Sequence, residues 1–174
     1  MSLRLRLIPR IALFSALIYV LSWGLSYLPN VNLIFFIVFL AGVMWGVGPG
    51  LLVGAMGMAL WTILNPFGPA APPIMVAQVA GTSLSGLVGA FFHRLGYVEL
   101  AGRKLTYALI ISATACTFLF YLPVNIVDAW VFRPFWPRFV AGMLWSLISL
   151  VTNMIIFSLL FRPARFVYNR ERAA

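Results

Sequence analysis

The sequence predicts an all-α integral membrane protein, folded as a single membrane domain over residues 1–174, with six transmembrane helices and cytoplasmic N and C termini. The first observation is composition: 63% of the residues are hydrophobic and 9% are charged, with a mean hydropathy of +1.04. Soluble domains are about half apolar and about a quarter charged. The second observation is a series of apolar runs of transmembrane length. The third is that basic residues gather beside alternate runs.

Each transmembrane helix needs about 20 mostly apolar residues to cross a hydrocarbon core of about 30 Å. The predicted helices, in chain order, cover residues 9–28, 32–46, 48–64, 72–92, 105–123 and 139–161. The second and third are short and are separated by GVGPG at 46–50, a turn of glycine and proline, so we expect two helices there rather than one. The first apolar run is long and lacks a small-residue cleavage site, so no signal peptide is expected.

The distribution of charge predicts the orientation independently of hydropathy. A six-helix arrangement with cytoplasmic termini places ten basic residues inside: Arg4, Arg6, Arg10, Arg94, Arg103, Lys104, Arg162, Arg165, Arg170 and Arg172. Only Arg133 and Arg138 fall outside, as the positive-inside rule requires. The net charge of +9 therefore indicates orientation and contact with anionic membrane lipid. Nucleic-acid binding is not expected, because these charges flank membrane spans.

The residues that most membrane enzymes need are missing from the sequence. The only acids are Glu99, Asp128 and Glu171, which form no cluster for a metal, and the only histidine is His93. Cys116 stands alone in an apolar run and is expected to be a packed small side chain. No phosphate-binding loop for ATP is present. We therefore expect no enzyme activity, no catalytic residue, no metal and no cofactor, and any uphill transport would need energy from another subunit.

Small residues recur at helical spacing. Ala12 and Ala16 are four residues apart, which puts both methyl groups on one helix face and allows another helix to approach closely. The same spacing occurs in Gly42 and Gly46, Gly50 and Gly54, Ala55 and Ala59, and the series Gly81, Ser85 and Gly89. Packing within the protein is the favoured interpretation for the later helices, since glycine and alanine are common in membrane helices.

The segment NPFGPAAPP at 65–73 has four prolines, which remove backbone donors and fix φ. It cannot be a helix, and the topology places it outside the cell. Irregular backbone at membrane depth needs cover from protein or a water-filled cavity, so the segment is predicted to lie over a polar pocket. A loop ordered in advance loses less entropy when ligand binds. The alternative is a tight connector without ligand contact.

Polar residues at membrane depth are costly and usually mark an interior path. Gln78 begins the fourth helix, Asn125 and Asp128 follow the fifth, and Asn153 lies inside the sixth. Asn153 is deep enough that a hydrogen bond between helices is an equal alternative to ligand contact. Asp128, in turn, could accept hydrogen bonds from a ligand or hold Arg133 in an ion pair.

Aromatic and basic residues are mixed between the last two helices. The segment VNIVDAWVFRPFWPR contains Trp130, Phe135 and Trp136 together with Arg133 and Arg138. These aromatic rings could form a girdle at the membrane interface. They could equally bind a flat heterocyclic ligand with polar or anionic groups, through stacking and charge-assisted hydrogen bonds.

Several motifs, taken in order, resemble the substrate-binding membrane subunit, or S component, of energy-coupling-factor (ECF) vitamin transporters. They are ALFSA in the first helix, PNV before the second, GVGPG after it, NPFGP followed by Gln78, and LISLVTNMIIF with Asn153 in the sixth. The similarity covers most of the chain. S components are small six-helix proteins of the prokaryotic cell membrane whose first helix packs, through an A-x-x-x-A face, on a transmembrane coupling subunit driven by two ATPase subunits.

The resemblance implies that the chain captures a small vitamin-like substrate outside the cell and topples within the membrane to release it inside. It implies that Ala12 and Ala16 form the docking face and that the 65–73 loop is a lid. The candidate substrate contacts are Asn65, Gln78, Asn125, Asp128, Trp130, Arg133 and Asn153. The alternative function, from another class, is a non-transport membrane subunit of an enzyme or assembly complex.

Overall fold

The computed structural model describes residues 3–28 and 30–173, and the side chains of residues 7–28 and 30–170. In these residues the regular structure is helical: α1 Leu3–Leu25, α2 Ile34–Trp45, α3 Val47–Leu64, α4 Pro72–Arg94, the short 3-10 helix η1 Tyr97–Glu99, α5 Gly102–Val131 and α6 Phe135–Ala173. The predicted all-α class is confirmed. Every α-helix except α2 is long and apolar enough to cross a membrane. The side chains of Arg4, Arg6, Glu171 and Arg172 lie outside the described residues.

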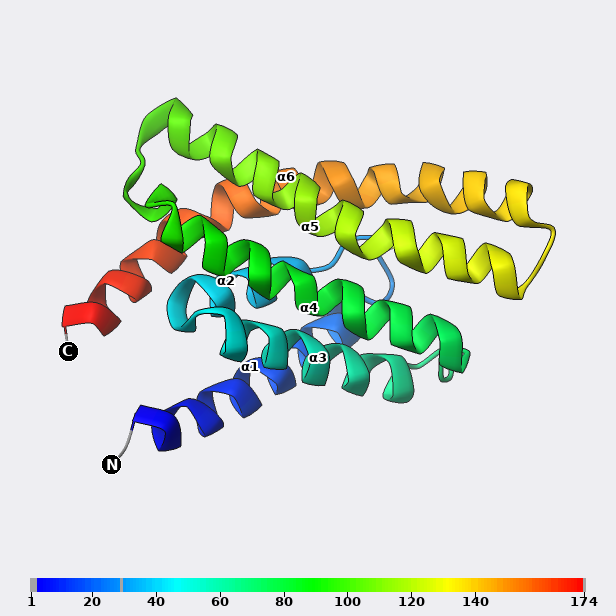
Figure 1. The fold of residues 1–174 in the computed structure, drawn as a ribbon, viewed down its shortest axis with the longest axis horizontal. Coiled ribbons are helices and arrows are strands. Elements are labelled where there is room, and N and C mark those ends of the chain that lie inside the picture. Colours follow the sequence, from blue (N-terminus) through cyan, green and yellow to red (C-terminus); the bar gives the residue numbers. More distant parts are fainter. Residues whose placement is uncertain (1–2, 29, 174) are drawn as a thin grey trace.

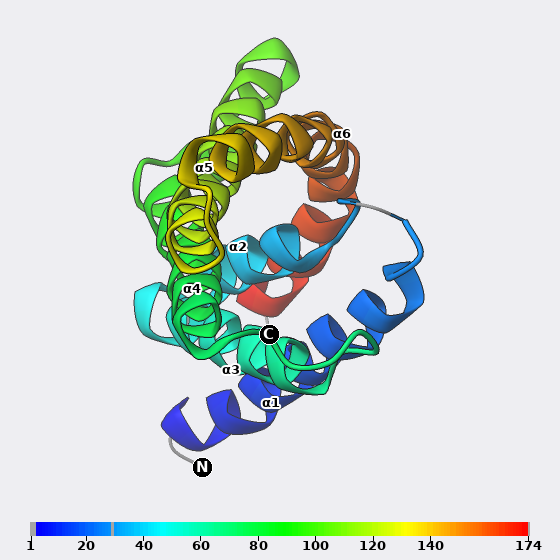
Figure 2. The same cartoon turned by 90° about the vertical axis from the view of Figure 1, so that its right-hand side faces the viewer.

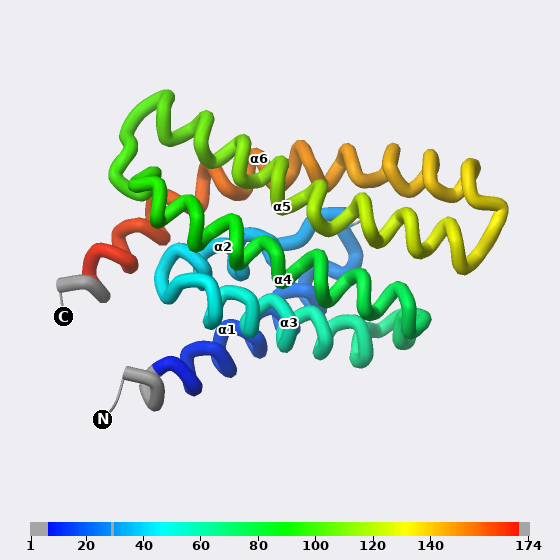
Figure 3. Tube along the Cα trace, viewed as in Figure 1, coloured from blue at the N-terminus to red at the C-terminus, as the bar shows by residue number. Residues whose placement is uncertain are grey.

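The helices form a bundle with both chain ends at one end (Figure 1). The α3–α4 and α5–α6 connections lie at the opposite end, and α5 and α6 run beside each other along the bundle (Figure 3). Viewed along its length, the bundle is a ring of α1, α3, α4, α5 and α6 around α2 (Figure 2). The connection between α1 and α2 crosses the interval between α1 and α6. This arrangement makes α2 the central element.

The central helix is short and almost completely covered. Nine of the 12 residues of α2 are buried, which is expected of a helix that is apolar on every side. Phe39 packs against Phe92 of α4 and Phe157 of α6, with ring centroids 5.2 and 4.9 Å apart. With about 1.5 Å of rise per residue, α2 is about 18 Å long, well short of the hydrocarbon core. It therefore occupies only part of the length of the surrounding helices.

Three glycines allow α2, α3 and α4 to pack backbone to backbone. A Cβ added to Gly50 of α3 would lie 2.8 Å from the Cα of Gly42 in α2 and 3.1 Å from the Cα of Gly86 in α4. A Cβ on Gly89 would likewise meet the backbone of Phe39. We call Gly42, Gly50 and Gly86 the glycine junction. The prediction that small residues in the second to fourth helices pack inside the protein is confirmed for Gly42, Gly50, Gly54, Gly81, Ser85 and Gly89, which are buried. Ala55 and Ala59 are only partly buried, and Gly46 lies at the break between α2 and α3.

The break between α2 and α3 is a single residue. Gly46 has a φ of +85°, a conformation that L side chains rarely adopt, and separates Trp45 from Val47. Pro49 follows in the first turn of α3, where the missing N–H costs no hydrogen bond. The prediction of two helices at GVGPG is therefore confirmed.

The last two helices are longer than predicted. Residues 105–123 and 139–161 were expected, but α5 continues through Pro123 to Val131 and α6 continues through Pro163 to Ala173. Asn125 and Asp128 consequently lie in the last turns of α5 rather than after it. Proline is tolerated in membrane helices where neighbouring groups compensate for the lost hydrogen bond. The carbonyl of Leu119, four residues before Pro123, lies against Gly81 of α4.

The glycine junction predicts opposite effects for two neighbouring substitutions in α3. Gly50→Ala forces a methyl group into backbone and should destabilise the protein by about 1 to 3 kcal/mol. Gly48 has nothing within 4 Å of an added Cβ, so Gly48→Ala should be neutral or stabilising by up to about 1 kcal/mol. Thermal unfolding in detergent measures both. Equal melting temperatures for the two variants would contradict the close approach at Gly50.

Candidate ligand-binding cavity

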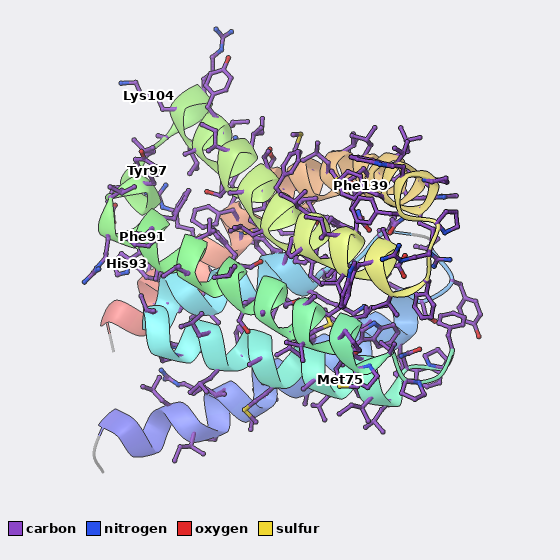
Figure 4. All side chains as sticks on the ribbon, turned by 45° about the vertical axis from the view of Figure 1, so that its right-hand side comes forward. Met75, Phe91, His93, Tyr97, Lys104 and Phe139 are labelled. Atoms are coloured by element: carbon purple, nitrogen blue, oxygen red, sulfur yellow. The ribbon has the colours of Figure 1, made fainter. Side chains whose placement is uncertain are left out.

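A half-enclosed cavity lies beyond the N-terminal end of α2, at the end of the bundle opposite the chain termini. It has two adjoining compartments of about 240 and 250 Å³. Both are lined by Asn30, Asn32, Ile34, Trp61 and Tyr121. Met75 and Phe139 mark this end of the bundle, and His93, Tyr97 and Lys104 mark the other (Figure 4). The cavity occupies the length that the short α2 leaves unfilled.

The two compartments differ in their walls. The first is completed by the C-terminal end of α1, through Ser22, Leu25 and Ser26. The second is deeper among the long helices and is completed by residues of α2, α3, α4 and α5, namely Phe35, Met58, Gln78, Phe120 and Val124. Together their volumes fall within the range of about 300 to 1,000 Å³ that small-molecule sites usually have.

Asn30 ties the α1–α2 connection to α5 and α6. Its φ of +58° is a left-handed conformation that asparagine tolerates better than most residues. The Tyr121 hydroxyl donates to Asn30 Oδ1 at 3.2 Å, and Ser149 Oγ donates to the Asn30 carbonyl at 2.8 Å. The two hydroxyl oxygens are 2.6 Å apart. This network holds the wall that carries Asn32 in place without any ligand.

Gln78 lines the second compartment, close to the site predicted for it. Its Oε1 accepts a hydrogen bond of 2.6 Å from Thr62 Oγ1, which joins α4 to α3. The side-chain NH₂ group of Gln78 takes no part in that bond and remains as a donor. Of the residues predicted to contact a substrate, Gln78 is the one that lines the cavity.

Asn32 supplies an acceptor without a partner. Its Oδ1 is buried and makes no hydrogen bond with the described residues. Buried polar atoms are nearly always paired, because an unpaired one costs about 1 to 3 kcal/mol. Since Asn32 lines both compartments, a ligand or ordered water in the cavity is the natural partner for this atom.

The proline-rich loop is ordered by its own first residue. Asn65 Oδ1 accepts from the Phe67 N–H at 2.9 Å, and Asn65 Nδ2 donates to the Gly68 carbonyl at 2.8 Å. The Ala70 N–H donates back to the Thr62 carbonyl of α3 at 3.0 Å. Both polar atoms of Asn65 are therefore used within the loop, and these local hydrogen bonds are consistent with the rigidity predicted for it. Asn65 does not line the cavity.

Asn125 and Asn153 connect α5 with α6. Asn153 is buried and donates from Nδ2 to Thr117 Oγ1 at 3.0 Å, so the interpretation as a hydrogen bond between helices is confirmed. Asn125 Nδ2 lies 3.4 Å from the Met143 sulfur and packs against Gly142. Neither side chain lines the cavity.

Asp128 forms an ion pair, with a different partner from the one predicted. A pair with Arg133 was one of the two alternatives considered, but Arg138 donates to both carboxylate oxygens, at 3.1 and 3.3 Å. The pair is partly exposed, and Arg138 also lies over the Phe132 ring. Trp130 and Arg133 are exposed at the same end of the bundle. Asp128, Trp130 and Arg133 lie outside the cavity lining, and their contact with a substrate stays a prediction.

The outer face of α1 is uncovered. Ala12 and Ala16 are both exposed, and α1 packs mainly on α3, where its Ile18 fills the space beside Gly57. Large apolar side chains surround the two alanines: Ile8, Leu13, Leu17, Val20 and Trp23. Ala12 and Ala16 therefore do not serve packing within this chain.

Sequence reasoning missed Asn30, Asn32, Trp61 and Tyr121. Asn30 is the middle residue of PNV, which was noted only as a motif before the second helix, and Asn32 directly follows that motif. Trp61 and Tyr121 lie in segments that were interpreted only as apolar helices. Comparison of the chain with protein-family models, curated proteins and solved structures returns no match. Among the described residues no three His, Cys, Asp or Glu side chains form a group that could hold a metal.

The network around Asn30 predicts the effect of removing one hydroxyl. Tyr121→Phe should raise hydrogen exchange of the 30–33 backbone about fivefold, because losing one such bond costs about 1 kcal/mol. Tyr107→Phe is the matched control, since Tyr107 lies exposed on the same helix. Mass spectrometry of exchange in detergent measures both. Unchanged protection in Tyr121→Phe would show that other contacts hold the connection.

Proposed function

We propose that this chain is the substrate-capture subunit of an ATP-driven importer of the ECF type, and that it binds a water-soluble vitamin or related small metabolite. The observation that carries the proposal is the half-enclosed cavity lined by asparagine, glutamine and aromatic side chains. Its walls are ordered by hydrogen bonds of their own, which reduces the entropy lost on binding. No enzyme activity, cofactor or metal is part of the proposal.

Charge supports an orientation with the cavity facing outward. The described basic residues near the end that holds both termini are Arg10, Arg94, Arg103, Lys104, Arg162, Arg165 and Arg170. The opposite end has Arg133 and Arg138, of which Arg138 is paired with Asp128. Under the positive-inside rule both termini are cytoplasmic, in a prokaryotic plasma membrane. In this orientation α2 crosses part of the bilayer, and the segment before it continues to the outer surface.

The uncovered face of α1 supports a partner subunit. Ala12 and Ala16 leave space for another helix to approach within close backbone distance. We propose that a transmembrane coupling subunit, driven by two ATPase subunits, docks there, and that toppling of this chain against it delivers the substrate. Energy must come from such a partner, because the sequence has no phosphate-binding loop.

Cysteine labelling in intact cells tests the orientation. Phe67 is 75% exposed in the α3–α4 loop, and Ala101 is exposed between η1 and α5. Phe67→Cys should react with a membrane-impermeant maleimide from outside, and Ala101→Cys should react only after lysis. Cys116 is fully buried and provides the low background. The reverse pattern would overturn the orientation.

Substitution of the α1 face tests capture and docking separately. The substrate is first identified by mass spectrometry of small molecules released from the purified protein, and its uptake and binding are then measured. Ala12→Trp with Ala16→Trp should abolish uptake, because two indoles fill the space for the partner helix, and should leave binding within about threefold, under about 0.7 kcal/mol. Val151→Trp with Ile155→Trp is the control, with the same spacing on the exposed face of α6.

Unchanged uptake in the double alanine variant would contradict docking through α1. Lost binding in that variant would show that the face affects the cavity rather than a partner. A protein that releases no small molecule and supports no uptake would contradict capture itself, and the non-transport alternative would then be favoured.

A further inference from the structure

The cavity has no charge of its own. Neither compartment is lined by an acidic or basic side chain. Asp128, the only acid at this end, is engaged by Arg138 through two hydrogen bonds. An ion moved from water into such a site loses hydration that neutral dipoles replace only in part. The lining therefore favours a ligand whose enclosed part is uncharged.

The second compartment holds an unpaired acceptor and an unused donor together. Asn32 Oδ1 is buried without a partner. Gln78 uses its oxygen to accept from Thr62, so its NH₂ group is left to donate. The nearby hydroxyls of Ser22 and Ser26 donate to carbonyls of their own helix, at 2.7 and 2.8 Å. A ligand that satisfies Asn32 and Gln78 together presents one N–H donor and one carbonyl acceptor.

The walls favour a flat ligand. Phe35, Phe120 and Tyr121 pack against one another, with ring centroids 4.9 to 6.2 Å apart. Trp61 lines both compartments but has no ring partner and no hydrogen bond to its indole N–H among the described residues. Aromatic rings that pair adopt offset-stacked or edge-to-face arrangements. A planar ligand would supply the missing partner for Trp61.

We infer that the cavity binds an uncharged, planar heterocycle of the cyclic-amide class, whose ring N–H donates to Asn32 Oδ1 and whose carbonyl accepts from the Gln78 amide. The ring stacks on Trp61. This inference rests on the proposed capture function and narrows its substrate class. Of the polar or anionic groups that the sequence suggested for a flat heterocyclic ligand, it retains only the polar ones, because Arg133 and Arg138 lie outside the cavity lining.

Three related probes test the inference: 2-quinolone, which is a neutral bicyclic cyclic amide, N-methyl-2-quinolone, which lacks the N–H donor, and the anionic 2-quinolone-4-carboxylate. Calorimetric titration of the full chain in detergent at neutral pH should show binding of 2-quinolone. The carboxylate should bind more than about tenfold more weakly, because its charge must be desolvated. Methylation of the ring nitrogen should weaken binding about tenfold, because Asn32 Oδ1 is again left unpaired.

The Asn32→Ala variant tests whether Asn32 Oδ1 is the partner of the ring N–H. Without Oδ1, 2-quinolone and its N-methyl form should bind within about twofold of each other. Asn169→Ala is the matched control, because Asn169 is exposed near the C-terminal end of α6, and it should keep the tenfold difference. If Asn32→Ala does not fold, the three probes on the unmodified chain decide the matter alone.

Three results would overturn the inference: no binding of 2-quinolone, equal or tighter binding of the carboxylate, or a methylation effect that persists in Asn32→Ala. Two further results distinguish a failure of this inference from a failure of the proposed function. Import of a co-purified carboxylate or phosphate compound would overturn the neutral ligand class and leave capture standing. Binding of 2-quinolone with the predicted ratios in a chain that supports no import would support the ligand class and contradict the importer.

Discussion

Direct backbone contact at the glycine junction is the constraint on which the rest of the structure depends. Because Gly42, Gly50 and Gly86 have no side chains, α2 fits inside the ring of longer helices instead of joining it. Apolar attraction between helices is weak in lipid, so close packing of this kind is a main source of association. Once α2 is central and short, space remains beyond its first turn. The cavity is therefore a consequence of where this helix sits and how early it ends.

Hydrogen bonds within the protein hold the wall of that space in position. The α1–α2 connection has irregular backbone, and irregular backbone at membrane depth must find partners within the protein. Asn30 finds them in Tyr121 and Ser149. The same connection carries Asn32, whose Oδ1 has none. The wall is therefore well bonded at Asn30, and two residues later it offers an acceptor to whatever occupies the cavity.

Hydropathy and turn residues predicted the helices, the break at Gly46 and the rigid loop after α3, because each has a local cause. They failed at Pro123 and Pro163, because both helices continue through the proline and the local sequence gives no sign of it. Gln78 was predicted as a site residue because it is polar at membrane depth and lies soon after the loop. Asn30, Trp61 and Tyr121 come from three segments that meet only when α2 is buried, and the apolar runs around Trp61 and Tyr121 hide their role.

The first helix belongs to both proposed surfaces. Ser22, Leu25 and Ser26 near its C-terminal end line one compartment, while Ala12 and Ala16, at least six residues earlier, are exposed. Between them Ile18 packs beside Gly57, so α1 is held mainly by α3 and only slightly by α2. A rigid helix with one principal neighbour moves as a unit. A shift of α1 against α3 would therefore alter the cavity wall and the outer face together, and under the proposed function any coupling between substrate binding and docking would be reciprocal in energy.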